Sequence, residues 1–243
     1  MMDEGVALGM LDAIGAVITN SHVVYTSGRH GSAYVNKDVV YPHSYITSRL
    51  CRTIAEEFES DDVDVVVAPA VGGVILSQWV AHHLCALSNS DVDGIYAERS
   101  EWVLRKPSSG ICFTVSVGAE TYSLAAGQEL VIKEDAFVIK RGYEKLVPGR
   151  RVLVVEDVLT TGGTVKKVIR AVRELGGEVV GLGALCNRGG LTAESIGVPK
   201  LFALTNVTLD SWEGEACPLC AQNVPINTDV GKGRDFLASQ KKK

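Results

Sequence analysis

Residues 152–164 constrain the fold of this chain more than any other stretch. An apolar run at 152–155 leads into two adjacent acidic residues, Glu156 and Asp157, and then into a loop of Thr and Gly that opens a helical pattern. A short apolar run of this kind is typical of a strand buried on both faces of a parallel sheet. In open α/β folds, ligands bind where such strands end. We therefore expect an α/β protein with a site at residues 156–164.

Further runs with the same character predict the rest of the sheet. Short apolar stretches recur at 63–68, 179–185 and 201–204, with helical patterns between most of them. Ser44 can cap a helix that continues to about Glu57. After residue 164, apolar side chains recur on one helical face until a glycine pair ends the pattern. The fold class that follows is α/β, with a doubly wound, mostly parallel sheet.

Segments outside this pattern indicate extensions of one domain spanning residues 1–243. Residues 1–43 hold an amphipathic helix, with apolar side chains at Val6, Leu8 and Leu11, and then a β-hairpin that turns at 27–31. Residues 99–149 alternate like β structure, so we expect an inserted hairpin or flap rather than a strand of the central sheet. The core is then 44–206, and 207–243 form a C-terminal extension.

Composition narrows the possible partners. The chain has 243 residues, 46% of them apolar, and a formal net charge of −5, with no long basic run before the last three lysines. These values suit one α/β domain that binds a small molecule rather than nucleic acid. No apolar run approaches the roughly 20 residues that a membrane span needs, and the first residues are acidic. We expect a cytoplasmic protein with no membrane partner.

The six cysteines are scattered, which favours reduced thiols over a disulfide framework. Cys217 and Cys220 form the only CxxC. A structural zinc site needs four ligands, and neither a second CxxC nor a paired His motif lies nearby in the sequence, so this motif is weak support for zinc. The alternative is that two small residues pack under a C-terminal turn.

The loop after the acidic pair has the composition of a phosphate site. Its small residues let backbone N–H groups and hydroxyls approach a phosphate, and the following helix N-terminus adds positive potential. The carboxylates can accept hydrogen bonds from vicinal ribose hydroxyls and stabilise a developing cation. A Walker loop or a GxGxxG loop does not fit these residues, and a plain helix-start loop leaves the acidic pair unexplained. The predicted phosphate-binding residues are Thr160, Thr161, Gly162, Gly163 and Thr164.

This motif resembles the phosphoribosyl pyrophosphate (PRPP) signature of type I phosphoribosyltransferases at every position of its pattern. The resemblance implies that Glu156 and Asp157 bind the ribose and act in catalysis. It also implies a pyrophosphate loop after the first core strand, at Ala70, Val71, Gly72 and Gly73. Mg²⁺ would be the cofactor, held mainly by PRPP oxygens and water, with no dedicated protein ligands.

Among these enzymes, the chain is most similar to orotate phosphoribosyltransferases, through residues 26–30, 34–38 and 217–220. The resemblance implies that the hairpin covers the pyrimidine and that Tyr34, Lys37, Thr160 and Arg188 contact the base or its carboxylate. A planar guanidinium also fits a carboxylate on its own chemistry. Two positions depart from the family pattern, because Thr26 and Gly72 stand where the family often has lysine.

The family's mobile catalytic loop is rich in Lys and Arg, and only Arg99 holds its place here. Lys140 and Arg141 are substitutes by proximity. A loop that closes over PRPP would put a cation on pyrophosphate and exclude water. In the family this loop reaches a neighbouring subunit, which implies a homodimer.

The main hypothesis from the sequence is transfer of ribose 5-phosphate from PRPP to orotate in pyrimidine (UMP) synthesis. Two alternatives stay open. One is a phosphoribosyltransferase for a purine or another nucleobase, and the other is a PRPP-sensing regulator without catalysis. The intact acidic pair favours an enzyme.

Overall fold

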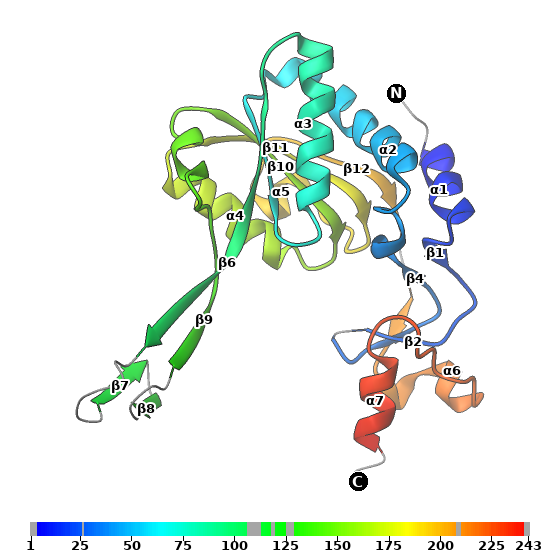
Figure 1. Ribbon diagram of the computed structural model, residues 1–243. Coiled ribbons are helices and arrows are strands. Elements are labelled where there is room, and N and C mark those ends of the chain that lie inside the picture. Colours follow the sequence, from blue (N-terminus) through cyan, green and yellow to red (C-terminus); the bar gives the residue numbers. More distant parts are fainter. Residues whose placement is uncertain are drawn as a thin grey trace.

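A six-stranded sheet forms the centre of the structure, a computed structural model (Figure 1). It describes residues 4–25, 27–105, 113–117, 120–124, 129–207 and 210–240, without the side chains of 101–122 and 124–134. The strand order is β12-β11-β10-β5-β6-β9, and all neighbours are parallel except β6 and β9. The strands are β5 (Val65–Pro69), β6 (Asp93–Arg105), β9 (Glu129–Val138), β10 (Arg151–Leu159), β11 (Glu178–Asn187) and β12 (Leu201–Asn206).

Helices cover both faces of this sheet, which confirms the doubly wound α/β class. Because side chains alternate along a strand, Leu153 and Val155 of β10 enter the core beneath one helix layer, and Val152 and Val154 enter the core beneath the other. The first layer holds α1 (Glu4–Ala13), α2 (Ser44–Glu57) and α3 (Val74–Ser88), and the second holds α4 (Gly163–Glu174) and α5 (Ala193–Ile196).

The N-terminal helices differ in detail from the sequence prediction. In α1, Val6 and Leu8 are exposed, and Leu11 packs into the core beside Ala7. The helix therefore presents a narrower apolar face than the one predicted. Ser44 is the first residue of α2 rather than its cap, a position taken by His43 without a side-chain hydrogen bond.

A small lobe formed by both ends of the chain lies below the sheet in Figure 1. Its core is a three-stranded sheet in the order β13-β3-β2, with an antiparallel β2–β3 hairpin whose turn contains Gly28 at φ +82°. A two-stranded pair of β1 and β4 leads to it. We call this region the terminal lobe. Its elements are β1 (Val17–Ile18), β2 (Val23–Val24), β3 (His30–Gly31), β4 (Tyr34–Val35), β13 (Ser211–Trp212), α6 (Pro218–Ala221) and α7 (Gly233–Gln240).

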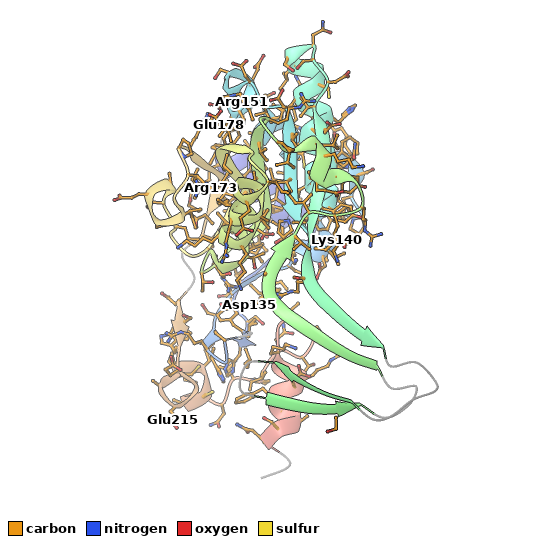
Figure 2. The ribbon with its side chains drawn as sticks, turned by 90° about the vertical axis from the view of Figure 1, so that its left-hand side faces the viewer. Asp135, Lys140, Arg151, Arg173, Glu178 and Glu215 are labelled. Atoms are coloured by element: carbon orange, nitrogen blue, oxygen red, sulfur yellow. The ribbon has the colours of Figure 1, made fainter. Side chains whose placement is uncertain are left out.

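A long two-stranded arm leaves the sheet on its other side (Figure 1). It consists of the outer parts of β6 and β9, and the paired strands β7 (Phe113–Val117) and β8 (Glu120–Leu124) lie at its far end. The sequence prediction separated residues 99–149 from the central sheet, and this is wrong for β9, which is its edge strand. Asp135 on β9 pairs with Lys167 of α4 and so ties the arm to the core (Figure 2).

The remaining regular elements are short 3-10 turns at Lys37–Val39, Glu59–Asp61, Tyr143–Leu146 and Gly214–Ala216. Of the helices in the described residues, none combines the length and the apolar character that crossing a membrane requires.

A close contact between α2 and β11 allows a test of how tightly the first helix layer packs on the sheet. A Cβ atom added at Gly183 would lie 2.6 Å from Cγ2 of the fully buried Ile54. We predict that Gly183→Ala lowers the free energy of unfolding by about 1–3 kcal/mol through overpacking. In an Ile54→Ala background the same change should cost much less. Urea denaturation of the four proteins measures this coupling, and additive effects would contradict the packing described.

Candidate active site

A cavity of about 350 Å³ opens where β5 and β10 end, at the carboxyl edge of the sheet. Most of the site residues predicted from the sequence lie around it, although they come from five separate parts of the chain. Those that line it are Tyr34, Lys37, Ala70, Val71, Gly72, Arg99, Glu156, Asp157, Thr160, Thr164 and Arg188.

The loop between β10 and α4 forms a smaller hollow of about 40 Å³ beside this cavity. Its lining includes Glu156 and every predicted phosphate-binding residue, Thr160, Thr161, Gly162, Gly163 and Thr164. The loop ends at the N-cap of α4, Gly162. The first N–H groups of a helix have no partner within the helix and carry partial positive charge. The hollow is therefore suited to a phosphate group.

The two carboxylates point into different surroundings because they are neighbours on a strand. The side chain of Glu156 lies on the same face of the strand as that of Val154, and it lines the hollow of the β10–α4 loop. The side chain of Asp157 lies on the same face as that of Val155, toward Lys37 in the segment that follows β4. Both are buried, with exposed fractions of 8% and 4%. One strand thus presents an acid on each of its faces at the same end.

Asp157 is held by three donors. Lys37 Nζ donates to its Oδ2 at 2.6 Å, Tyr41 Oη approaches the same oxygen at 3.4 Å, and the backbone N–H of Val158 donates to Oδ1 at 2.7 Å. Burial alone would lower the pKa of Lys37, but the hydrogen bond and the charge of Asp157 outweigh it and raise that pKa. The Lys37–Asp157 pair is therefore a charged contact.

Glu156 is held by fewer hydrogen bonds than Asp157. Its Oε1 accepts a hydrogen bond from the backbone N–H of Asp157 at 3.1 Å. Burial, and after it the neighbouring charge of Asp157, raises the pKa of Glu156 to about 8. A buried carboxyl group with a raised pKa is common in active sites.

The loop after β5 runs directly beneath the Lys37–Asp157 pair. A Cβ atom at Gly72 would lie 2.4 Å from Asp157 Oδ2 and 2.5 Å from Lys37 Nζ. A side chain at position 72 would collide with this pair, which explains the glycine there. Where the family often has a lysine in this loop, the ammonium group here comes from Lys37. Val71 at the tip is 87% exposed. Gly73 does not line the cavity and packs against Ala68.

The terminal lobe forms one wall of the cavity and contributes two residues that the sequence did not predict, Tyr25 and Gly231. Arg188 lies over the ring of Tyr25, with Cζ 4.5 Å from the ring centroid, and both line the cavity with Gly231. Tyr25 directly precedes the hairpin turn, so its aromatic character was the available signal. Gly231 lies in the C-terminal extension, where no local pattern indicated a site. Val35, Pro69, Phe137 and Val158 complete the lining.

The cations predicted for the flap at residues 99–149 separate into two groups. Arg99 lines the cavity, and its guanidinium lies over the ring of Phe137 at 5.5 Å. Lys140 and Arg141 do not line it. They pair with Glu98 at 3.3 and 2.8 Å, where the arm joins the core (Figure 2). Thr26 lies outside the described residues.

Comparison with known proteins agrees with this geometry. The phosphoribosyl transferase domain model matches residues 43–216. An orotate phosphoribosyltransferase from Pelotomaculum thermopropionicum is 35% identical over 223 residues, which covers 92% of this chain and 94% of the relative. Another, from Caldanaerobacter subterraneus subsp. tengcongensis, is 32% identical over 210 residues, covering 86% and 88%. The chain belongs to the orotate phosphoribosyltransferase family.

A solved structure shows that the fold is shared as well. The orotate phosphoribosyltransferase of Mycobacterium tuberculosis, crystallised with Fe(III) dicitrate, superposes with a TM-score of 0.56 at 22% identity, covering 85% of this chain and 97% of the other. In this member of the orotate phosphoribosyltransferase family, the phosphate hollow and the acidic pair both lie within the residues that the domain model matches.

The raised pKa of Glu156 predicts a pH-dependent stability. Between its ordinary value of 4.5 and about 8, the folded protein keeps a proton that the unfolded chain releases, so stability falls as the pH rises. Glu156→Gln removes this dependence. Its stability relative to wild type should therefore increase by roughly 2–4 kcal/mol from pH 5 to pH 9, since one pKa unit corresponds to about 1.4 kcal/mol.

Denaturant unfolding at several pH values measures this difference. Glu178→Gln is the control, because Glu178 is exposed and pairs with Arg151 at the opposite end of the strands (Figure 2). Its stability should differ from that of wild type by a constant amount. A constant difference for Glu156→Gln as well would show that Glu156 is already ionised in the folded protein.

Proposed function

We propose that this protein transfers ribose 5-phosphate from PRPP to orotate, giving orotidine 5′-monophosphate and pyrophosphate in pyrimidine nucleotide synthesis. The observation that carries the proposal is that three kinds of group adjoin one another at the edge of the sheet. A phosphate hollow, an acidic pair and an arginine stand at the ends of neighbouring strands. The sequence identity with orotate phosphoribosyltransferases supports the choice of base.

The β10–α4 loop would bind the 5′-phosphate of PRPP. Its hydroxyls and N–H groups, together with the N-terminus of α4, supply donors and positive potential without a basic side chain. The ribose would then extend from Thr164 toward the acidic pair, where carboxylate oxygens accept hydrogen bonds from its hydroxyls.

In the reaction, N1 of orotate gives up its proton and forms a bond to C1 of the ribose as the bond from C1 to the pyrophosphate oxygen breaks, and the pyrophosphate oxygens can accept that proton. Pyrophosphate leaves with the bonding electrons, and positive charge develops on the ribose ring. A carboxylate fixed near that charge stabilises it more than it stabilises the neutral sugar, and this difference lowers the barrier. Asp157 is suited to this role because Lys37, Tyr41 and Val158 hold it in place.

The leaving pyrophosphate would lie against the loop of Ala70, Val71 and Gly72. Two cations could meet the pyrophosphate there. The Lys37 ammonium lies close to Gly72 of this loop, and Arg99, where β6 leaves the core, lines the same cavity. To reach the pyrophosphate, Lys140 or Arg141 would first have to leave Glu98, with which both pair.

The base would lie between the terminal lobe and the strand ends. Arg188 would bind the orotate carboxylate bidentately, with Tyr25 supporting its guanidinium from the side. Tyr34 would cover the pyrimidine ring, and Thr160 would contact its edge. These roles account for the presence of an arginine and two tyrosines in a cavity otherwise suited to phosphate.

Mg²⁺ is the cofactor implied by the family, and the lining residues fit a metal that arrives with its substrate. Hard oxygen ligands suit Mg²⁺, but Asp157 already accepts from Lys37, and Glu156 favours its protonated form. Pyrophosphate oxygens and water would therefore supply most of the ligands. Bound in this way, the ion would neutralise charge on the leaving group.

We further propose that residues 1–243 act as one domain in the cytoplasm and that the protein is a homodimer in which the arm of one subunit reaches toward the site of the other. The arm projects away from its own core (Figure 1), which supports an intersubunit role. Sedimentation of the active protein as a monomer would remove the dimer proposal.

Initial rates with different bases test the function directly. With PRPP and Mg²⁺, we expect turnover of orotate and little or none of uracil, adenine, hypoxanthine or xanthine. Arg188→Met should lower kcat/KM for orotate by roughly 10–150-fold, because a hydrogen bond to a charged group contributes about 1.5–3 kcal/mol. Arg150→Met is the matched control, since Arg150 is exposed and pairs with Asp64 at the other end of the sheet.

Three outcomes would count against the assignment. Turnover of a purine without orotate would replace the substrate. PRPP binding without product from any base would indicate a sensor. Equal loss of activity in the Arg188 and Arg150 variants would remove the carboxylate role from Arg188.

A further inference from the structure

Four side chains that ligate metals in other proteins converge in the terminal lobe, away from the cavity residues described above. They are His22, His30, Cys217 and Cys220. One ligand atom from each lies within 4.8 Å of the other three, and three of the four residues are buried. We propose that these four residues bind one structural zinc ion that joins the two ends of the chain.

The spacing of the ligand atoms agrees with a tetrahedral zinc site. With Zn–N bonds of about 2.0–2.1 Å and Zn–S bonds of about 2.3 Å, ideal N···S edges are about 3.6 Å and the N···N edge is about 3.3 Å. Here, Cys217 Sγ and Cys220 Sγ each lie 3.6 Å from His22 Nε2, and Cys220 Sγ lies 3.3 Å from His30 Nδ1. The two nitrogens are 2.9 Å apart. Two thiolates with two imidazoles in this geometry favour zinc.

Hydrogen bonding alone does not account for this cluster. His22 Nδ1 lies 2.7 Å from the carbonyl oxygen of Val224, which can only accept, so Nδ1 carries the proton. In the neutral ring Nε2 then has a single lone pair. Three groups approach that one lone pair, His30 Nδ1 and both sulfurs. This lone pair can accept one hydrogen bond, which leaves the other two groups without a partner there. A cation at the centre would bind all four ligand atoms.

The contact with Val224 is also the support that zinc-bound histidines usually have. A ligating imidazole typically donates its other N–H to a carbonyl or carboxylate, which fixes the ring and its tautomer. For His22 this leaves Nε2 facing the sulfurs. The outer nitrogen of His30, Nε2, is buried and has no hydrogen-bond partner in the described part of the chain, and its ring packs edge-on against Phe236.

Local structure brings the two halves of the site together. On the hairpin, His22 precedes β2 and His30 lies on β3 opposite Val24. Cys217 is the N-cap of α6 and Cys220 lies one turn later, so both sulfurs lie on one side of that turn. The His pair that a zinc site requires is thus supplied by residues nearly two hundred positions away in sequence, which explains why the CxxC looked incomplete by itself.

The ion would stabilise a region with little core of its own. The strands β2, β3 and β13 are each two residues long, and isolated sheets of this size are at best marginally stable. Small units commonly gain their stability from a metal. Tyr25 and Gly231 belong to the same lobe and line the cavity, so the ion would also fix one wall of the active site.

Zinc analysis of the purified full-length protein tests the proposal. After dialysis, wild type should hold about one zinc ion per chain, and Cys217→Ser with Cys220→Ser less than about a tenth of that. Cys85→Ser is the matched control, because Cys85 is a half-buried cysteine outside the cluster that contacts the backbone of Val92. It should keep the full zinc content. Co²⁺ in place of zinc should give the visible spectrum of a tetrahedral site with thiolate ligands.

Chelation of the wild-type protein gives a second measurement if the double variant does not fold. Removal of zinc should lower Tm, and added Zn²⁺, but not Mg²⁺, should restore it. Wild-type protein without zinc that takes up neither Zn²⁺ nor Co²⁺ would overturn the proposal. So would zinc content that is unchanged in the double variant, or a Cys217–Cys220 disulfide found by mass spectrometry after thiol blocking.

Discussion

The hydrogen-bonded ion pair between Lys37 and Asp157 connects three parts of the chain that are distant in sequence. Lys37 follows the strands of the terminal lobe, Asp157 ends a central strand, and the loop at Gly72 passes directly beneath both. Asp157 is almost fully buried, so removal of Lys37 would leave a buried carboxylate without its cationic partner and destabilise the folded protein. The position of the cavity wall over the strand ends therefore depends on this contact.

The same pair separates the behaviour of the two acids. Asp157 accepts hydrogen bonds from a cation and two further donors, whereas burial raises the pKa of Glu156 on the other face of the strand. Two acids with such different surroundings can have different roles in one reaction. The alternation of side chains along a strand is sufficient to produce this difference from two adjacent residues.

Features with a local cause could be predicted from the sequence, and those with a distant cause could not. The strand, the acidic pair and the Thr/Gly loop follow one another along residues 152–164, so their order predicted the α/β sheet and placed a candidate site at its carboxyl edge. The tie between Lys37 and Asp157, the stacking of Arg188 on Tyr25 and the sheet position of β9 all depend on long-range packing. The same limit hid the histidines that face Cys217 and Cys220.

Steady-state kinetics of the acidic pair test the central claim most directly. Glu156→Gln and Asp157→Asn keep side-chain size but replace carboxyl groups that would accept from the ribose hydroxyls and, at Asp157, stabilise the developing positive charge. We therefore expect kcat with orotate to fall roughly tenfold to a thousandfold, with smaller changes in PRPP affinity. Thr164→Val removes a hydroxyl from the phosphate hollow and should chiefly raise KM for PRPP. If the doubly substituted protein retained wild-type kcat/KM for every base tested, the acidic pair would be structural and the account of this site would be wrong.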